Sequence, residues 1–328
     1  MVRMTVLASG SKGNSTVVSS SRTRILVDAG LSCRELFKRM LAAGEDPRTL
    51  DAILVTHEHQ DHVQGLAVTA RKLGIPVYFT EPTHRAWVRW MTPRKRLTYA
   101  DWLAQRKQQA EAAASSEAAL NIEIEEKEAF EEEQAIDLNG VADPMSAASK
   151  MEARRETDPC ALPGGVEYFS AGQGFSVGDI AVTPFTIPHD AADPVGFVFE
   201  AEGIRIGLAT DLGYMPANAA MRLRRCDVLM LESNHDLDML RDGPYPWSVK
   251  QRVMSRVGHL SNHAAAEFLE ESYDGQAAYV VLAHISESNN LPELARISAE
   301  RALRDHMSLL ANKLLLATQE APLESIVL

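Results

Sequence analysis

The 328-residue sequence has little of what marks several large classes of protein. Its three cysteines lie far apart and form no CxxC pair, so we expect neither a disulfide framework nor a cysteine zinc site. No apolar run approaches the roughly eighteen residues of a membrane-spanning helix, and the first residues do not read as a secretory signal. We therefore expect a cytoplasmic protein without membrane contact.

Positive charge is also scarce. Lysine and arginine total 33 against 45 acidic residues, and the formal net charge of −12 argues against a protein that coats nucleic acid through bulk positive charge. Residues 104–158 alone hold fourteen acidic and six basic side chains and no apolar run of strand length. The rest of the chain is only mildly acidic, at −4, so a nucleic-acid substrate is still compatible with the charge.

The composition of residues 104–158 also bears on domain organisation. We predict a single domain over 1–328, with 104–158 as an acidic, low-complexity insertion that is solvated and has no core of its own. The alternative is an acidic mimic that occupies a nucleic-acid groove until it is displaced.

Short apolar segments that end in a histidine or an acid recur along the chain. The segments and the residues that follow them are 52–55 with His57, 180–187 with His189, 204–209 with Asp211, 228–231 with Glu232, and 278–283 with His284. Helical patterns at 61–73, 263–272 and 292–310 alternate with these predicted strands, which indicates an α/β fold. Strand ends at one edge of a sheet commonly carry the chemistry of such folds.

The most informative stretch is His57-x-His59-x-Asp61-His62. Residues two apart in an extended chain point the same way, so His57 and His59 can reach one ion. The chain then turns into a predicted helix, where Asp61 and His62 can face a second ion. Nitrogen and carboxylate ligands without thiolate suit zinc, manganese or iron. Packing alone is a much weaker interpretation of four ligand-type residues within six positions.

This stretch resembles the hallmark of the metallo-β-lactamase fold superfamily, in which a distant His, an Asp and a final His complete the set. Here those residues are His189, Asp211 and His284, each at a predicted strand end. The resemblance implies a four-layer αββα sandwich and two divalent metal ions. The implied ligands are His57, His59 and His189 for one ion and Asp61, His62 and His284 for the other, with Asp211 bridging both.

Several further stretches resemble the YycJ (WalJ) group of that superfamily. They are SGSKGNS at 9–15, PHDAADPVG at 188–196, ESNHD at 232–236, GPYPW at 243–247, GHLSN at 258–262 and AHIS at 283–286. Members of the group are linked to 5′-to-3′ exonuclease activity on DNA, and the resemblance covers most of the chain outside 104–158. It implies a dinuclear metal-dependent phosphodiesterase that hydrolyses nucleic acid, DNA rather than RNA, through attack of hydroxide on phosphorus.

Two side chains are expected to act in catalysis. Asp61 would orient or deprotonate the attacking water in addition to binding its ion. Residues 258–261 also resemble a helix-start motif of ribonuclease Z, in which the histidine protonates the leaving oxygen, and this implies the same role for His259. Capping or packing is the alternative for His259. His235 either supports the metal site from outside or simply ends a strand.

Substrate contacts are expected from turn residues near the strand ends. Their hydroxyl, amide and backbone groups can hold phosphate, although ordinary turn chemistry explains the same residue types. The candidates are Ser9, Ser11, Asn14, His235, Ser261, Asn262, Ser286, Asn289 and Asn290. Residues 84–99 form a basic stretch with interleaved aromatics that suits single-stranded ends; an amphipathic helix with its tryptophans packed inward is the alternative.

Two other functions stay open. The same metal site could hydrolyse small cyclic or nucleotide phosphodiesters, or a thioester, because a fold does not specify a substrate. A regulatory protein whose insertion binds a partner and whose metal site is vestigial is a further alternative, against which the complete set of seven ligand residues counts. A homodimer is one option for assembly, and the sequence leaves the oligomeric state open.

Overall fold

The computed structural model describes residues 1–92, 103, 106–107, 158–304 and 313–328. Met1–Met91 and Asp158–Leu328 form one compact unit, and Thr92–Thr157 form a second. The expected insertion at 104–158 lies almost entirely outside the described residues, so it stays a prediction. All helices and strands named below belong to the first unit.

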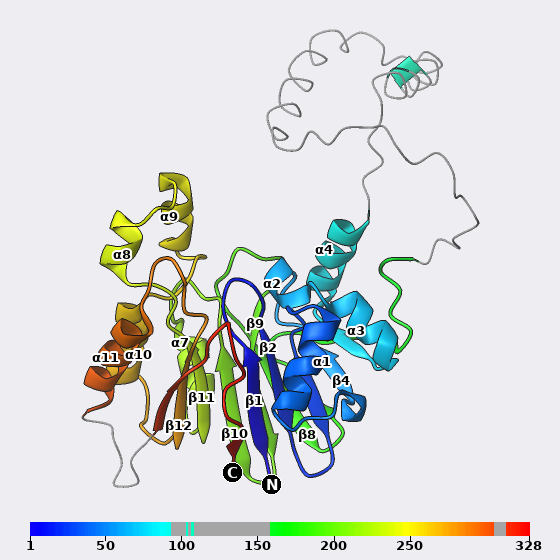
Figure 1. Cartoon of the computed structure of the whole chain (residues 1–328), viewed down its shortest axis with the longest axis horizontal. Helices are drawn as coiled ribbons and strands as arrows, with labels where there is room; N and C mark the ends of the chain where they lie inside the picture. Colours follow the sequence, from blue (N-terminus) through cyan, green and yellow to red (C-terminus); the bar gives the residue numbers. More distant parts are fainter. Residues whose placement is uncertain (93–102, 104–105, 108–157, 305–312) are drawn as a thin grey trace. The chain divides into compact units, whose positions relative to one another are not determined.

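Two seven-stranded sheets make up the centre of this unit (Figure 1). The first has the order β14-β1-β2-β3-β4-β5-β6, with the bounds Ile326–Val327, Arg3–Ala8, Ser15–Ser19, Arg24–Val27, Ala52–Leu54, Val77–Phe79 and Val166–Tyr168. The second has the order β13-β12-β11-β10-β9-β8-β7, with the bounds Lys313–Leu316, Tyr279–Ala283, Val228–Glu232, Ile204–Ala209, Val195–Ala201, Ile180–Thr186 and Phe175–Val177. Both sheets mix parallel and antiparallel pairs.

Helices cover the outer face of each sheet (Figure 1). On the first sheet lie α1 (Cys33–Ala42), α2 (Gln60–Val63), α3 (Leu66–Leu73) and α4 (Glu81–Met91). On the second lie α7 (Ala217–Leu223), α10 (Asn262–Glu271) and α11 (Pro292–Leu303), while α8 (Leu237–Asp242) and α9 (Trp247–Val253) follow β11. The expected αββα sandwich is confirmed. None of the described helices is long and apolar enough to cross a membrane.

Alternating side chains bury both faces of the central strands. In β3, Ile25 and Val27 lie in the core between the sheets, whereas Leu26 packs in the core under α1, α3 and α4. In β11, Met230 lies in the core between the sheets and Leu229 packs in the core under the helices of the second sheet. Because side chains of a strand point to alternate faces, a strand covered on both sides needs a continuous apolar run. This requirement explains the short apolar segments of the sequence.

The strands that precede the polar residues end at a common edge of each sheet. In the second sheet β10, β11 and β12 run parallel, and β8 has the same direction because β9 is antiparallel to both β8 and β10. Asp28 and His284 directly follow β3 and β12, and Asp211 lies two residues after the end of β10; their φ angles are 60°, 54° and 62°. Left-handed backbone costs a non-glycine residue about 1 kcal/mol or more. These sharp turns therefore hold strain where the polar side chains gather.

The helix predicted over 61–73 is in fact two helices. α2 ends at Val63 and α3 begins at Leu66, with Gly65 between them. The Gly65 amide donates to the Ala29 carbonyl at 2.8 Å, and a Cβ built on Gly65 would lie 1.9 Å from the Leu31 carbonyl oxygen. The expectation of one continuous helix was wrong because the chain after β3 passes directly against this point.

Gly30 provides a test of this close packing. A Cβ built on Gly30 would lie 1.7 Å from the Asp61 carbonyl oxygen and 2.5 Å from the Asn14 amide nitrogen. We predict that Gly30→Ala lowers the free energy of unfolding by about 2 kcal/mol or more, because backbone atoms must move apart. Urea denaturation measures the loss. Gly174→Ala is the matched control, since its nearest contact would be 3.6 Å, and an equal loss in both variants would contradict the prediction.

Candidate metal centre

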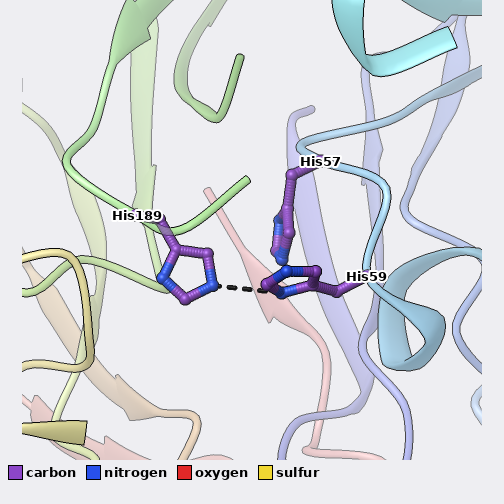
Figure 2. A group of neighbouring side chains, drawn as sticks. All are labelled: His57, His59 and His189. Atoms are coloured by element: carbon purple, nitrogen blue, oxygen red, sulfur yellow. Dashed lines mark hydrogen bonds between the residues drawn. The ribbon is translucent and has the colours of Figure 1, made fainter. Parts of the chain in front are cut away.

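Three imidazole rings form the first cluster (Figure 2). His57 and His59 follow β4 and His189 follows β8, and one ring nitrogen of each lies within 4.8 Å of the others. His59 Nδ1 and His189 Nε2 are 3.2 Å apart. Three nitrogens converging in this way match the donor set of a protein zinc or other transition-metal site.

The outer nitrogen of each of these rings contacts the protein. The partners are the Thr56 hydroxyl for His57 Nδ1 (3.0 Å), the Asp190 carbonyl for His59 Nε2 (3.2 Å) and the Gly258 carbonyl for His189 Nδ1 (3.0 Å). Such contacts orient the rings of metal-binding histidines and select the tautomer. The inner nitrogens, His57 Nε2, His59 Nδ1 and His189 Nε2, are left for an ion.

A second cluster contains Asp61, His62, Asp211 and His284, whose ligand atoms also lie within 4.8 Å of one another. His284 Nε2 is 3.4 Å from Asp61 Oδ2 and 3.4 Å from Asp211 Oδ1, and Asp211 Oδ2 is 3.4 Å from His62 Nε2. The rings of His57 and His62 have centroids only 4.1 Å apart, so the two clusters adjoin. The structure thus gathers all seven residues expected as ligands.

The state of the buried polar atoms fits bound cations. Among the described residues, His57 Nε2 and Asp211 Oδ2 are buried and make no hydrogen bond. Burial lowers the pKa of His57, and the nearby His62 adds to this, which leaves the neutral ring that metal binding requires. Burial also acts to lower the pKa of His62, but Asp211 and Asp61 raise it well above its usual value. The carboxylates therefore demand positive charge, which divalent ions would supply.

Asp28 supports the second cluster from behind. It is buried at the end of β3, and its Oδ2 lies 2.8 Å from His62 Nδ1. The Thr56 amide and hydroxyl donate to its two oxygens at 2.9 and 2.8 Å. Burial raises the pKa of Asp28, although its contact with His62 opposes this. Asp28 thus fixes the ring of His62 so that Nε2 points to Asp61 and Asp211.

Glu232, for which the sequence predicts no role, plays a similar part in the second sheet. It is buried at the end of β11, and its Oε1 lies 2.8 Å from His259 Nδ1 and 3.0 Å from His284 Nδ1. The Leu212 and Leu260 amides donate to Oε2. Burial would raise the pKa of Glu232, but the contacts with His259 and His284 hold it at about 2. The available signal was its place after an apolar strand, which it shares with the predicted ligands.

A cavity of about 320 Å³ opens beside the two clusters. Its lining includes His59, Asp61, Asp211 and His284, together with His259 and Ser11. The His259 side chain is 23% exposed, and its ring centroid lies 5.1 Å from those of both His189 and His284. His259 thus faces the cavity rather than the core, although its role as an acid stays a prediction.

The residues expected to contact substrate fall into two groups. Ser11 lines the cavity, whereas Asn14 donates to Asp61 Oδ2 at 3.1 Å and Ser9 Oγ accepts from the His284 amide at 2.8 Å. The others lie buried behind the strand ends, where several share hydrogen bonds: His235, Ser261, Asn262, Ser286, Asn289 and Asn290. Ser11 is therefore the member of the set best placed for a substrate, and the binding roles of all of them stay predictions.

The basic stretch at 84–99 is described only as far as residue 92, so Arg94, Lys95, Arg96 and Tyr99 lie outside the described residues. Its first part belongs to α4, where Trp87 is fully buried and Trp90 is 53% exposed. Arg85 pairs with Glu81 at 2.6 Å. One tryptophan packs inward, as in the amphipathic alternative, and the other faces outward.

A sequence profile of the Metallo-beta-lactamase superfamily matches residues 8–245. The chain belongs to this superfamily. It is 31% identical over 304 residues to the exodeoxyribonuclease YycJ of Bacillus anthracis, which covers 93% of this chain and 90% of that protein. It is 30% identical over 296 residues to the exodeoxyribonuclease WalJ of Streptococcus pneumoniae, with coverage of 90% and 86%.

Solved structures agree on the fold. The metallo-beta-lactamase fold protein YhfI of Bacillus subtilis matches with a TM-score of 0.58 and 14% identity, over 98% of this chain and 99% of that chain. The short form of human tRNase Z matches with a TM-score of 0.52 and 13% identity, over 98% of each chain. Superfamily membership together with the histidine and aspartate clusters indicates divalent metal binding. The chain is a metal-dependent hydrolase.

The support that Asp28 gives to His62 can be tested by a nearly isosteric change. We predict that Asp28→Asn weakens metal affinity by about 10- to 100-fold, because His62 loses the carboxylate that orients its ring. Competition with a chelator measures the affinity. Asp179→Asn is the matched control, since Asp179 accepts a hydrogen bond from Ser20 away from the clusters. Unchanged affinity in Asp28→Asn would show that Asp28 has no such role.

Proposed function

We propose that this chain is a two-metal nuclease that hydrolyses DNA from the 5′ end. The observation that carries the proposal is the pair of adjoining clusters, one of three histidines and one that contains Asp211. Two divalent ions side by side are the common device for hydrolysing phosphodiesters. The relatives at 30–31% identity, which are named as exodeoxyribonucleases, support DNA as the substrate.

The proposed ligand assignment follows the two clusters. His57, His59 and His189 would hold one ion, Asp61, His62 and His284 the other, and Asp211 both. The nitrogen and oxygen donors suit zinc, manganese or iron. Ions bound there would lower the pKa of a water and neutralise the charge that builds up on the phosphate.

Two side chains of the protein would accept and donate the protons of the reaction. Asp61 has a carboxylate in the cavity that can accept a proton from the attacking water, and Asn14 orients it through Oδ2. His259 lies on the cavity wall with Nδ1 bound to Glu232, which leaves Nε2 to donate a proton to the leaving oxygen. Burial acts to lower the pKa of His259, but Glu232 raises it above the usual value, so the ring can hold that proton near neutral pH.

We also propose that the protein acts in the cytoplasm. Cys33 and Cys226 are free thiols buried in the fold, as is usual in a reducing compartment.

The nuclease proposal predicts a specific pattern of products. With manganese or zinc added, the full chain should release mononucleotides first from the 5′ end of a labelled DNA strand, and it should cut RNA more slowly. Gels of 5′- and 3′-labelled strands report polarity. His57→Ala should lose metal and cleavage together, whereas His263→Ala, an exposed histidine on α10, should lose neither. Metal-loaded protein that leaves both polymers intact would refute the proposal.

The role of His259 predicts a dependence on the leaving group. His259→Ala should keep its metal content and lose about 100-fold or more in kcat on DNA, whose leaving oxygen needs a proton. The kcat of the same variant on an aryl phosphodiester should fall far less, because the phenolate leaves without a proton. Steady-state kinetics on both substrates, with metal analysis, measure this. Equal losses on both substrates, or retained turnover on DNA, would assign the proton to another group.

A further inference from the structure

One wall of the cavity comes from α9 and has no part in the metal clusters. Val249, Arg252 and Val253 line the cavity, and their spacing of three and four residues places them on one face of this helix. Arg252 is the one lysine or arginine among the described residues that line this cavity. A chain with a net charge of −12 thus places a cation beside its carboxylates.

The guanidinium of Arg252 is held next to the first cluster. Its Nε donates to Asp190 Oδ2 at 2.5 Å, and Asp190 Oδ1 lies 3.5 Å from His189 Nε2 and 4.0 Å from His59 Nε2. The Arg252 side chain is 65% exposed, and no described residue hydrogen-bonds its two Nη groups. One edge of the guanidinium is therefore fixed by the protein, and the Nη groups remain available to a ligand.

The backbone of α9 is also tied to the loop that carries His259. The His259 amide donates to the Val253 carbonyl at 3.0 Å, and a Cβ built on Gly258 would lie 2.1 Å from the same oxygen. Lys250 is buried and donates to the Arg241 carbonyl at 2.7 Å, which joins α9 to the end of α8. Arg252 therefore has a defined place relative to His259 and the clusters.

We propose that Arg252 binds a phosphate of the substrate strand that neighbours the scissile phosphate. This inference rests on the proposed nuclease function. A guanidinium presents its N–H groups as a planar fork that matches two phosphate oxygens, which an ammonium group does not. Asp190 acts as a positioning residue, because it fixes the Nε edge and leaves the Nη groups to the phosphate. Arg252 contributes to binding of the strand and takes no part in bond cleavage.

The test compares two variants and a control in the metal-loaded full chain. Arg252→Ala removes the charge and the fork, and Arg252→Lys keeps the charge alone. Arg256→Ala is the matched control, because Arg256 is an exposed arginine four residues further on, stacked over Tyr214 at 4.3 Å and outside the cavity lining. An exposed ion pair adds little to stability, so loss of Arg252 should leave the fold intact.

We expect Arg252→Ala to raise KM for single-stranded DNA about tenfold with kcat within about threefold of the wild type. Arg252→Lys should recover only part of this loss, and Arg256→Ala should behave as the wild type. The plot of log(kcat/KM) against log(salt) has a negative slope, and in Arg252→Ala this slope should become less steep by about 0.7. That is the value for one phosphate contact on a single strand. An aryl phosphodiester has no neighbouring phosphate, so its KM should change far less than that of DNA.

The outcomes separate the two proposals. A wild type that cuts DNA while Arg252→Ala keeps its KM and salt slope overturns the role of Arg252 alone. Equal losses on DNA and on the aryl phosphodiester also overturn it, because they would place the effect at the reacting phosphate. A wild type that hydrolyses the aryl phosphodiester but neither cuts DNA nor is inhibited by it overturns the nuclease function, and the Arg252 proposal with it.

Discussion

The burial of carboxylates at the strand ends is the constraint on which the rest of this structure depends. Asp28, Asp211 and Glu232 are each at most 3% exposed, and a buried charge is costly unless it is paired. Each lies against a histidine of the centre, and His62 and His284 together contact all three. The arrangement fixes the imidazoles and leaves a demand for positive charge that divalent ions would satisfy.

The backbone around the metal centre contains strained residues and close contacts that help to position these side chains. Asp28, Asp211 and His284 have positive φ, which redirects the chain within two residues of a strand end. Gly30, Gly65 and Gly258 let loops approach to distances that a side chain would prevent. The two sheets supply the rigid layers that hold these turns, because their cores are packed on both faces. The packed sheets thus hold the turns that carry the candidate ligands at one edge of the sandwich.

The electrostatic character of the chain is local. Overall it carries −12, yet one arginine stands on the wall of the cavity, and the clusters would hold divalent cations. Attraction of a polyanion depends on the potential at the site rather than on the net charge. A mainly acidic protein can therefore act on nucleic acid through a small cationic region.

The sequence by itself determined the apolar strands and the His57-to-His62 run, because ligand spacing and strand periodicity are local properties. It also placed His189, Asp211 and His284 at strand ends, and the resemblance to the superfamily assigned them as ligands. Only the tertiary structure decided which partners complete the centre. Asp28, Glu232 and Arg252 contact His62, His259 and Asp190 across 27 to 62 positions of chain. The break between α2 and α3 likewise depends on the strand-end loop that passes Gly65. Long-range contacts such as these follow from how two sheets pack, and no local pattern encodes them.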